Sequence, residues 1–90
     1  MSLLHITKEI HMTTHHERAV EQLMRRGRVQ LRDRENGNLY VSNQWDGTYK
    51  ILEWDDASDV DDHYEVTRDR GSALEEIAKW FASLEKIRAL

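Results

Sequence analysis

Polar and apolar residues alternate along the first part of the chain. Every second residue from Leu4 to Met12 is apolar, with Lys8 as the exception. A period of two with β-branched residues is typical of a half-buried strand. We therefore expect a strand over residues 4–12. The three residues at the start, 1–3, are compatible with a cloning remnant.

The pattern then changes to helical spacing. Thr14 and Glu17 match a capping box, in which the threonine oxygen accepts a backbone N–H and the glutamate reaches back to the cap. Gly27 can adopt the left-handed conformation that ends a helix, and Arg25 and Arg26 complement the helix dipole there. The sequence thus predicts a helix with one apolar stripe, formed by His16, Ala19, Val20, Leu23 and Met24.

Two glycine turns divide the next part of the chain into three strands. At the first turn, a three-residue loop over 35–37 with Gly37 left-handed is favoured, because it keeps the apolar residues of both strands on one face. This register pairs Leu31 with Val41. The residues that it places on the apolar face are Val29, Leu31, Leu39 and Val41.

Asp46-Gly47 predicts the second hairpin, which leads to a strand from Tyr49 to Trp54. A two-residue turn pairs Leu52 with Val41 and Trp54 with Leu39, and so extends the apolar face. The opposite face would then carry Tyr40, Tyr49 and Ile51.

The last third of the chain predicts a loop, a strand and a helix. Residues 55–62 are a loop by composition. A fourth strand is expected over 63–68 with Tyr64 and Val66 inward. Ser72 and Glu75 match a second capping box. The broad apolar face of the helix that follows consists of Leu74, Ile77, Ala78, Trp80, Phe81, Leu84 and Ile87.

Together these elements predict one α+β domain over residues 1–90. Its centre is an antiparallel meander of three to four strands, flanked by two amphipathic helices and extended by the N-terminal strand, in the order β-α-β-β-β-(β)-α. Ninety residues suffice for one hydrophobic core.

Composition narrows the classes of function. Without cysteine there are no disulfides, thiolate zinc sites or cysteine nucleophiles, which fits a cytoplasmic protein. No secretory signal and no apolar run of the ~20 residues that span a bilayer is visible. Since glycine-rich phosphate loops and nucleophile elbows are also missing, we expect no catalytic activity and no cofactor.

Charge is unevenly distributed along a chain whose net charge is −4. Seven acids and no lysine or arginine occur from Glu53 to Glu65. This acidic loop suggests a protein-interaction or regulatory module that docks a basic partner surface, with the exposed sheet face as a further docking site. Unpaired strand edges and the apolar helix faces also predict a homodimer. The expected partner-binding residues are Asp55, Asp56, Asp59, Asp61 and Asp62.

A nucleic-acid-binding module is the alternative, because five arginines lie between Arg25 and Arg34 with aromatic residues nearby. The overall acidity weighs against it, and arginines on an exposed face are also an ordinary solubilising pattern. The residues that it would use are Arg25, Arg26, Arg28, Arg32, Arg34, Tyr40 and Trp45.

Metal sites are not expected. The histidines at positions 5, 11, 15 and 16 cluster in sequence, but His11 and His15 straddle the predicted helix start, so the helical spacing of a zinc pair is not secured. The aspartate loop also fails the EF-hand pattern, since a start at Asp59 places Tyr64 at the sixth position and Arg70 at the twelfth.

Overall fold

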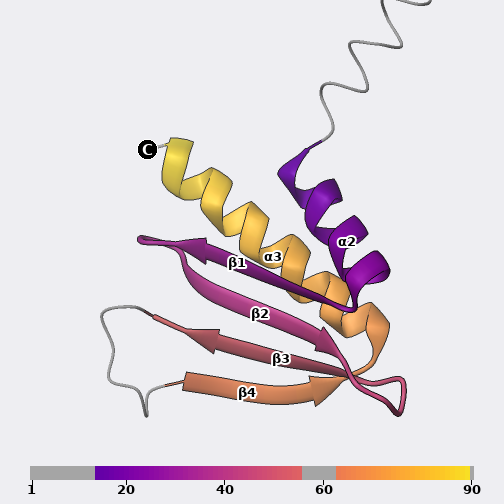
Figure 1. The fold of residues 1–90 in the computed structure, drawn as a ribbon. Helices are drawn as coiled ribbons and strands as arrows, with labels where there is room; N and C mark the ends of the chain where they lie inside the picture. Colours follow the sequence, from indigo (N-terminus) through magenta and orange to yellow (C-terminus); the bar gives the residue numbers. More distant parts are fainter. Residues whose placement is uncertain (1–13, 56–62, 90) are drawn as a thin grey trace, which may run out of the picture.

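The computed structural model describes residues 14–55 and 63–89. Helix α2 (His15–Arg26) is followed by strands β1 (Arg28–Asp33), β2 (Gly37–Asn43), β3 (Tyr49–Trp54) and β4 (His63–Arg68), and then by helix α3 (Arg70–Ala89). The strands form one antiparallel sheet in the order β1-β2-β3-β4, and both helices pack against the same face of it (Figure 1).

This architecture confirms the predicted α+β meander with two flanking helices and includes the fourth strand. The N-terminal strand expected over 4–12 lies outside the described residues. Neither described helix is long and apolar enough to cross a membrane.

Both ends of α2 follow the prediction. The Thr14 hydroxyl oxygen accepts the Glu17 N–H at 3.1 Å, and the Gly27 N–H, at a φ of 80°, donates to the Leu23 carbonyl at 2.8 Å. Ala19 and Leu23 are buried. The predicted stripe is too wide, however. Met24 is 42% exposed, because it lies at the margin of the face that packs on β1 and α3.

The first hairpin has the predicted faces but a different register. Val29 pairs with Val41 and Leu31 with Leu39, so the connecting residues are 34–36 and the expected pairing of Leu31 with Val41 is wrong. Gly37 does have a positive φ of 85°. Because the register differs by two residues, and side chains alternate with period two, all four residues stay on the predicted face.

The second hairpin corrects the predicted faces of β3. Val41 pairs with Ile51 and Tyr40 with Leu52, one residue away from the expected register. The cause is the turn: the Gln44 N–H donates to the Thr48 carbonyl at 2.7 Å, which encloses three residues rather than two. An odd shift moves every side chain to the other face. Tyr49, expected on the open face, is therefore 4% exposed and part of the core.

The edge strand β4 contributes one core residue. Val66 pairs with Ile51 and packs against the core, as expected. Tyr64 shares the parity of Val66 but is 54% exposed, so its predicted burial is wrong. It pairs with Glu53 on β3, where a hollow separates the strand from α3.

Helix α3 begins earlier than its predicted cap. The Asp69 carboxylate accepts the Ser72 N–H at 2.8 Å, and the Asp69 carbonyl accepts the Ala73 N–H at 3.1 Å. Asp69 thus performs the capping role that the sequence assigned to Ser72. Hydrogen bonds from the backbone N–H and the side chain of Ser72 hold the pKa of the Asp69 carboxyl group below its ordinary value. Ile77 and Leu84 on this helix are buried, as predicted.

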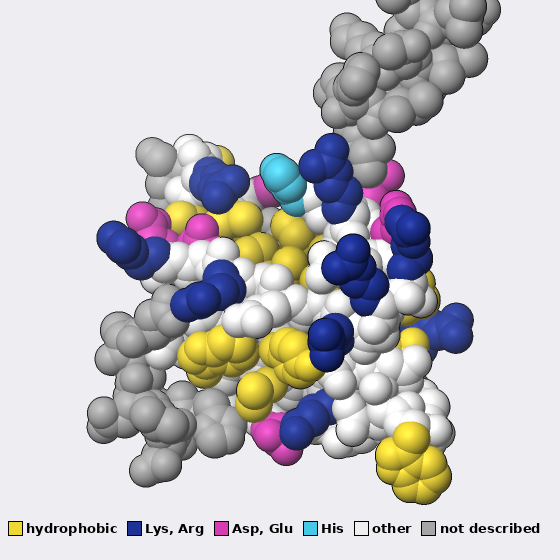
Figure 2. All heavy atoms as spheres, viewed as in Figure 1, with side chains coloured by type: hydrophobic (Ala, Val, Ile, Leu, Met, Phe, Trp, Pro, Cys, Tyr) yellow, Lys and Arg dark blue, Asp and Glu magenta, His cyan; other side chains and the backbone are white. Residues whose placement is uncertain are grey.

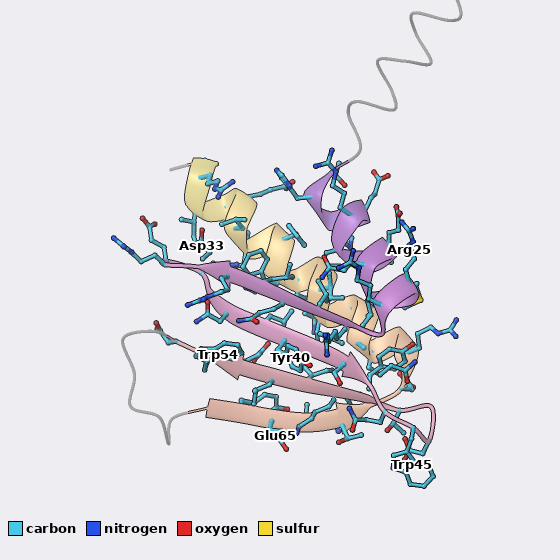
Figure 3. All side chains as sticks on the ribbon, in the orientation of Figure 1. Arg25, Asp33, Tyr40, Trp45, Trp54 and Glu65 are labelled. Carbon is cyan, nitrogen blue, oxygen red and sulfur yellow. The ribbon has the colours of Figure 1, made fainter. Side chains whose placement is uncertain are left out.

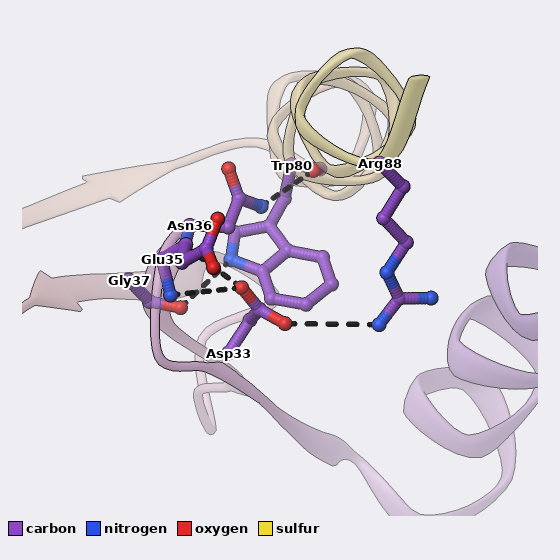
Figure 4. Close-up of polar contacts among 6 residues, drawn as sticks. All are labelled: Asp33, Glu35, Asn36, Gly37, Trp80 and Arg88. Carbon is purple, nitrogen blue, oxygen red and sulfur yellow. Dashed lines mark hydrogen bonds and ion pairs between the residues drawn. The ribbon is translucent and has the colours of Figure 1, made fainter. Parts of the chain in front are cut away.

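Polar contacts join α3 to the first hairpin (Figure 4). The Asn36 side-chain amide donates to the Trp80 carbonyl at 2.8 Å, and the Trp80 indole N–H donates to the Gly37 carbonyl at 3.2 Å. Asp33 accepts the Asn36 N–H at 2.9 Å and lies 3.7 Å from Arg88. These contacts hold α3 on one side of the sheet, and no helix or strand among residues 14–55 and 63–89 covers the other side.

Candidate binding surface

The side of the sheet that faces away from the helices carries an apolar patch. The register aligns Gln30, Tyr40, Leu52 and Glu65 across the four strands, with Trp54 in the neighbouring row. Figure 2 shows apolar side chains gathered at the centre of this side, and Figure 3 locates Tyr40 and Trp54 there. We call Tyr40, Leu52 and Trp54 the open-face patch; all three side chains are half-buried.

Basic side chains border the open-face patch. Arg28 and Arg32 lie on β1 and Lys50 lies on β3, all with the parity of the patch. Figure 2 shows several basic side chains around the apolar centre. Glu65 is the acidic member of the central row, and its carboxylate lies 3.7 Å from the Lys50 ammonium group. The strands of this face carry three cations and one acid, in contrast to the net charge of −4 for the chain.

The arginines singled out from the sequence do not lie on one surface. Arg28 and Arg32 share the open face, whereas Arg25 and Arg26 are in the last turn of α2, where Arg25 pairs with Glu21 at 3.0 Å. Arg34 is exposed in the first turn.

The predicted aromatic residues also separate. Tyr40 lies on the open face, while Trp45 is 97% exposed at the tip of the β2–β3 hairpin (Figure 3). Sequence reasoning missed Leu52 and Trp54, because the two-residue turn had placed them in the core. The length of the turn was the missing signal.

Of the acidic segment, Glu53 lies in β3 and Glu65 in β4, and within the loop over 55–62 the structure describes Asp55 alone. Asp55 is exposed and directly follows Trp54, so the loop departs from one end of the open-face patch. The remaining expected partner-binding residues, Asp56, Asp59, Asp61 and Asp62, lie outside the described residues.

The hollow between β3 and α3 has a volume of about 540 Å³ and lies on the helix side of the sheet. It is lined by Glu53, Tyr64, Glu76, Lys79 and Trp80 among others. Burial, the Glu76 charge and a hydrogen bond between the two side chains together raise the pKa of Glu53 above its ordinary value. The two carboxyl groups thus lie close to each other in this hollow. They do not make a metal centre: no group of three or more ligands suited to a metal occurs among residues 14–55 and 63–89.

His15 and His16, at the start of α2, line a different groove, between α2 and α3. The His16 ring lies 5.5 Å from the Phe81 ring, and His15 is exposed. The His16 imidazole therefore packs against an aromatic ring of α3.

Comparison with known proteins adds no relative, since no protein-family model, curated protein or solved structure matches this chain.

Proposed function

We propose that this protein is a non-catalytic module that docks a partner protein through the open face of its sheet. The observation that supports this proposal is the open-face patch: Tyr40, Leu52 and Trp54 stay partly exposed although the helices cover the other side of the same strands. Tryptophan, tyrosine and arginine are the residues that dominate binding energy at protein interfaces. A central apolar cluster with a polar rim is also the usual arrangement of such interfaces.

The border of the patch indicates the character of the partner. Arg28, Arg32 and Lys50 favour a surface whose apolar anchor is surrounded by acidic residues. Such charges mainly accelerate association, so binding should weaken as ionic strength rises. The acidic loop that begins at Asp55 would contribute a second contact, to a basic part of the same partner. We expect the complex to form in the cytoplasm.

Single-stranded nucleic acid is the competing ligand. It is favoured by one observation, the presence of Arg28 and Arg32 beside the Tyr40 ring, which resembles the combination of phosphate contacts and base stacking in single-strand binders. Two acidic groups oppose it, because Glu65 and Asp55 lie on or next to the same face. We therefore rank a protein partner first.

A pair of tryptophan variants tests the proposal. Partner proteins are captured from the native host on the wild-type chain, and the affinity of the purified partner is measured for Trp54→Ala and Trp45→Ala. Trp54→Ala should weaken binding by about tenfold or more, because an interface anchor is removed. Trp45→Ala should change it less than about twofold, since this ring lies at the hairpin tip. Circular dichroism establishes that both variants fold.

Equal affinity of the two variants for the partner would overturn the docking face. Nucleic acid is tested in parallel with labelled single-stranded DNA and RNA at low salt, measured by fluorescence anisotropy. Binding that is lost in Arg28→Glu and Arg32→Glu, but kept in Arg25→Glu, would replace the protein partner by nucleic acid as the ligand of this face.

A further inference from the structure

An apolar groove of about 1050 Å³ lies between α2, α3 and β1. His16 and Ala19 line it from α2, Phe81 and Leu84 from α3, and Leu31 from β1. Figure 2 shows apolar side chains in the hollow between the two helices, next to β1. None of the three open-face patch residues lines this groove, which reaches the open face only at Gln30 and Arg32 on β1.

The edge of β1 runs along this groove. In the described part of the chain β1 pairs with β2 only. The Asn43 N–H donates to the Gly27 carbonyl at 2.7 Å, so Gly27 and Asn43 are a hydrogen-bonded pair of the antiparallel ladder. Hydrogen-bonded and non-hydrogen-bonded pairs alternate along such a ladder. The backbone N–H and C=O of Val29 therefore point toward β2, whereas those of Arg28 and Gln30 point away from it. An edge of this kind can pair with one more strand.

The chain itself supplies a segment at the correct place. Thr14 and His15 line the groove, so the described part of the chain begins at its rim. Thirteen residues precede Thr14, enough to extend over roughly 40 Å, whereas a strand beside β1 needs only about 20 Å. Their apolar residues alternate, as a strand with one buried face requires.

We propose that residues 4–12, which lie outside the described residues, fill this groove as a strand beside β1. Ile6 and Ile10 would then share the face of Val29 and Leu31 and pack on the helices. The other parity carries Glu9, which would lie on the same face as the arginines of β1.

A second copy of the chain fits this edge less well. If two β1 strands paired antiparallel around Gln30, Arg28 of one copy would lie opposite Arg32 of the other. Like charges directly opposite one another destabilise a strand pair. Charge therefore favours residues 4–12, which contain a single acid, rather than a second copy of β1 as the strand that pairs with this edge.

A paramagnetic label tests the proposal in the full chain. Because the chain has no cysteine, Thr7→Cys creates a single attachment site. NMR spectra should lose the amide signals of Arg28 and Gln30 when the label is oxidised and recover them when it is reduced. The same label at Trp45→Cys is the control, which should affect the β2–β3 hairpin and leave Gln30 unchanged.

Two outcomes would overturn the proposal. One is that the label at position 7 leaves the β1 signals intact. The other is an effect between chains. In a mixture, spin-labelled chains at natural isotope abundance would broaden the β1 signals of isotope-enriched chains that carry no spin label. That result would assign the groove to a second copy. A second variant adds Ile10→Asp to the labelled chain. It should restore the Gln30 signal, because a carboxylate cannot be buried against Phe81 without cost.

Discussion

The two faces of the sheet differ most clearly at two neighbouring residues of β3. Ile51 is fully buried beneath the helices, whereas Leu52 is half-buried on the open face. The two side chains are similar in size and hydrophobicity, so their chemistry does not explain which of them enters the core. The difference originates in the β2–β3 turn, where three enclosed residues set the parity of the whole strand.

The same comparison explains the chemical character of each face. The covered face brings together the buried residues Leu39, Val41, Tyr49 and Ile51 under α2 and α3. The open face retains apolar side chains of comparable size, which no described element covers. Apolar surface left uncovered on one side of a small sheet is a common mark of an interaction site. This contrast is why we propose the open face as the binding surface.

Alanine substitutions at the two β3 residues test the contrast directly, and we expect the largest effect here. Ile51→Ala should lower the free energy of unfolding by about 2–5 kcal/mol, because it leaves a cavity in the core. Leu52→Ala should cost about 1 kcal/mol, since its side chain is only partly withdrawn from water. Urea denaturation measures both values. The reverse order would mean that the two-residue turn and its register are correct.

Local signals explain which parts of the fold were predictable. Thr14, Glu17 and Gly27 determine the ends of α2 through contacts within three or four residues, so the sequence pattern predicted them. The faces of β3 depend on a turn in which Trp45 is enclosed along with Asp46 and Gly47, and the sequence there allowed more than one loop length. The open-face patch depends on the same turn, and its candidate residues were therefore only partly predicted.

The start of α3 gives a second, smaller test, because this helix covers one of the two faces and its first turn follows β4 directly. Asp69→Ala should lower Tm by about 4–8 °C, the usual effect of losing a helix cap. Ser72→Ala is the matched control, and its effect should be smaller, since it removes the Ser72 side-chain bond but keeps the Ser72 N–H bond to the Asp69 carboxylate. Equal losses would restore Ser72 as the cap.

The Asp69 effect should also depend on pH. Its pKa is lowered in the folded chain, so its contribution is present above the pKa of the unfolded chain and is lost as the pH falls. The difference in Tm between the wild type and Asp69→Ala should therefore shrink on acidification. Thermal unfolding followed from pH 7 to pH 3 measures it.

Glu53 offers the smallest and most selective test, because it is a carboxyl group on the covered face. Its pKa is raised by burial and by Glu76, so the folded chain favours the protonated form. The stability that this preference provides is present below the pKa of the unfolded chain and is lost as the pH rises through the raised value. Glu53→Gln should remove this loss and raise Tm at pH 7 by roughly 1–3 °C relative to wild type.

Glu75→Gln is the control for Glu53, since this residue is exposed on α3 and the substitution makes the same change in charge. Its Tm should follow that of the wild type between pH 4 and pH 7. If both variants gained equally at pH 7, the effect would come from the lower net charge of the chain. A gain confined to Glu53→Gln would show that the covered face disfavours a carboxylate where the open face tolerates Glu65 beside Lys50.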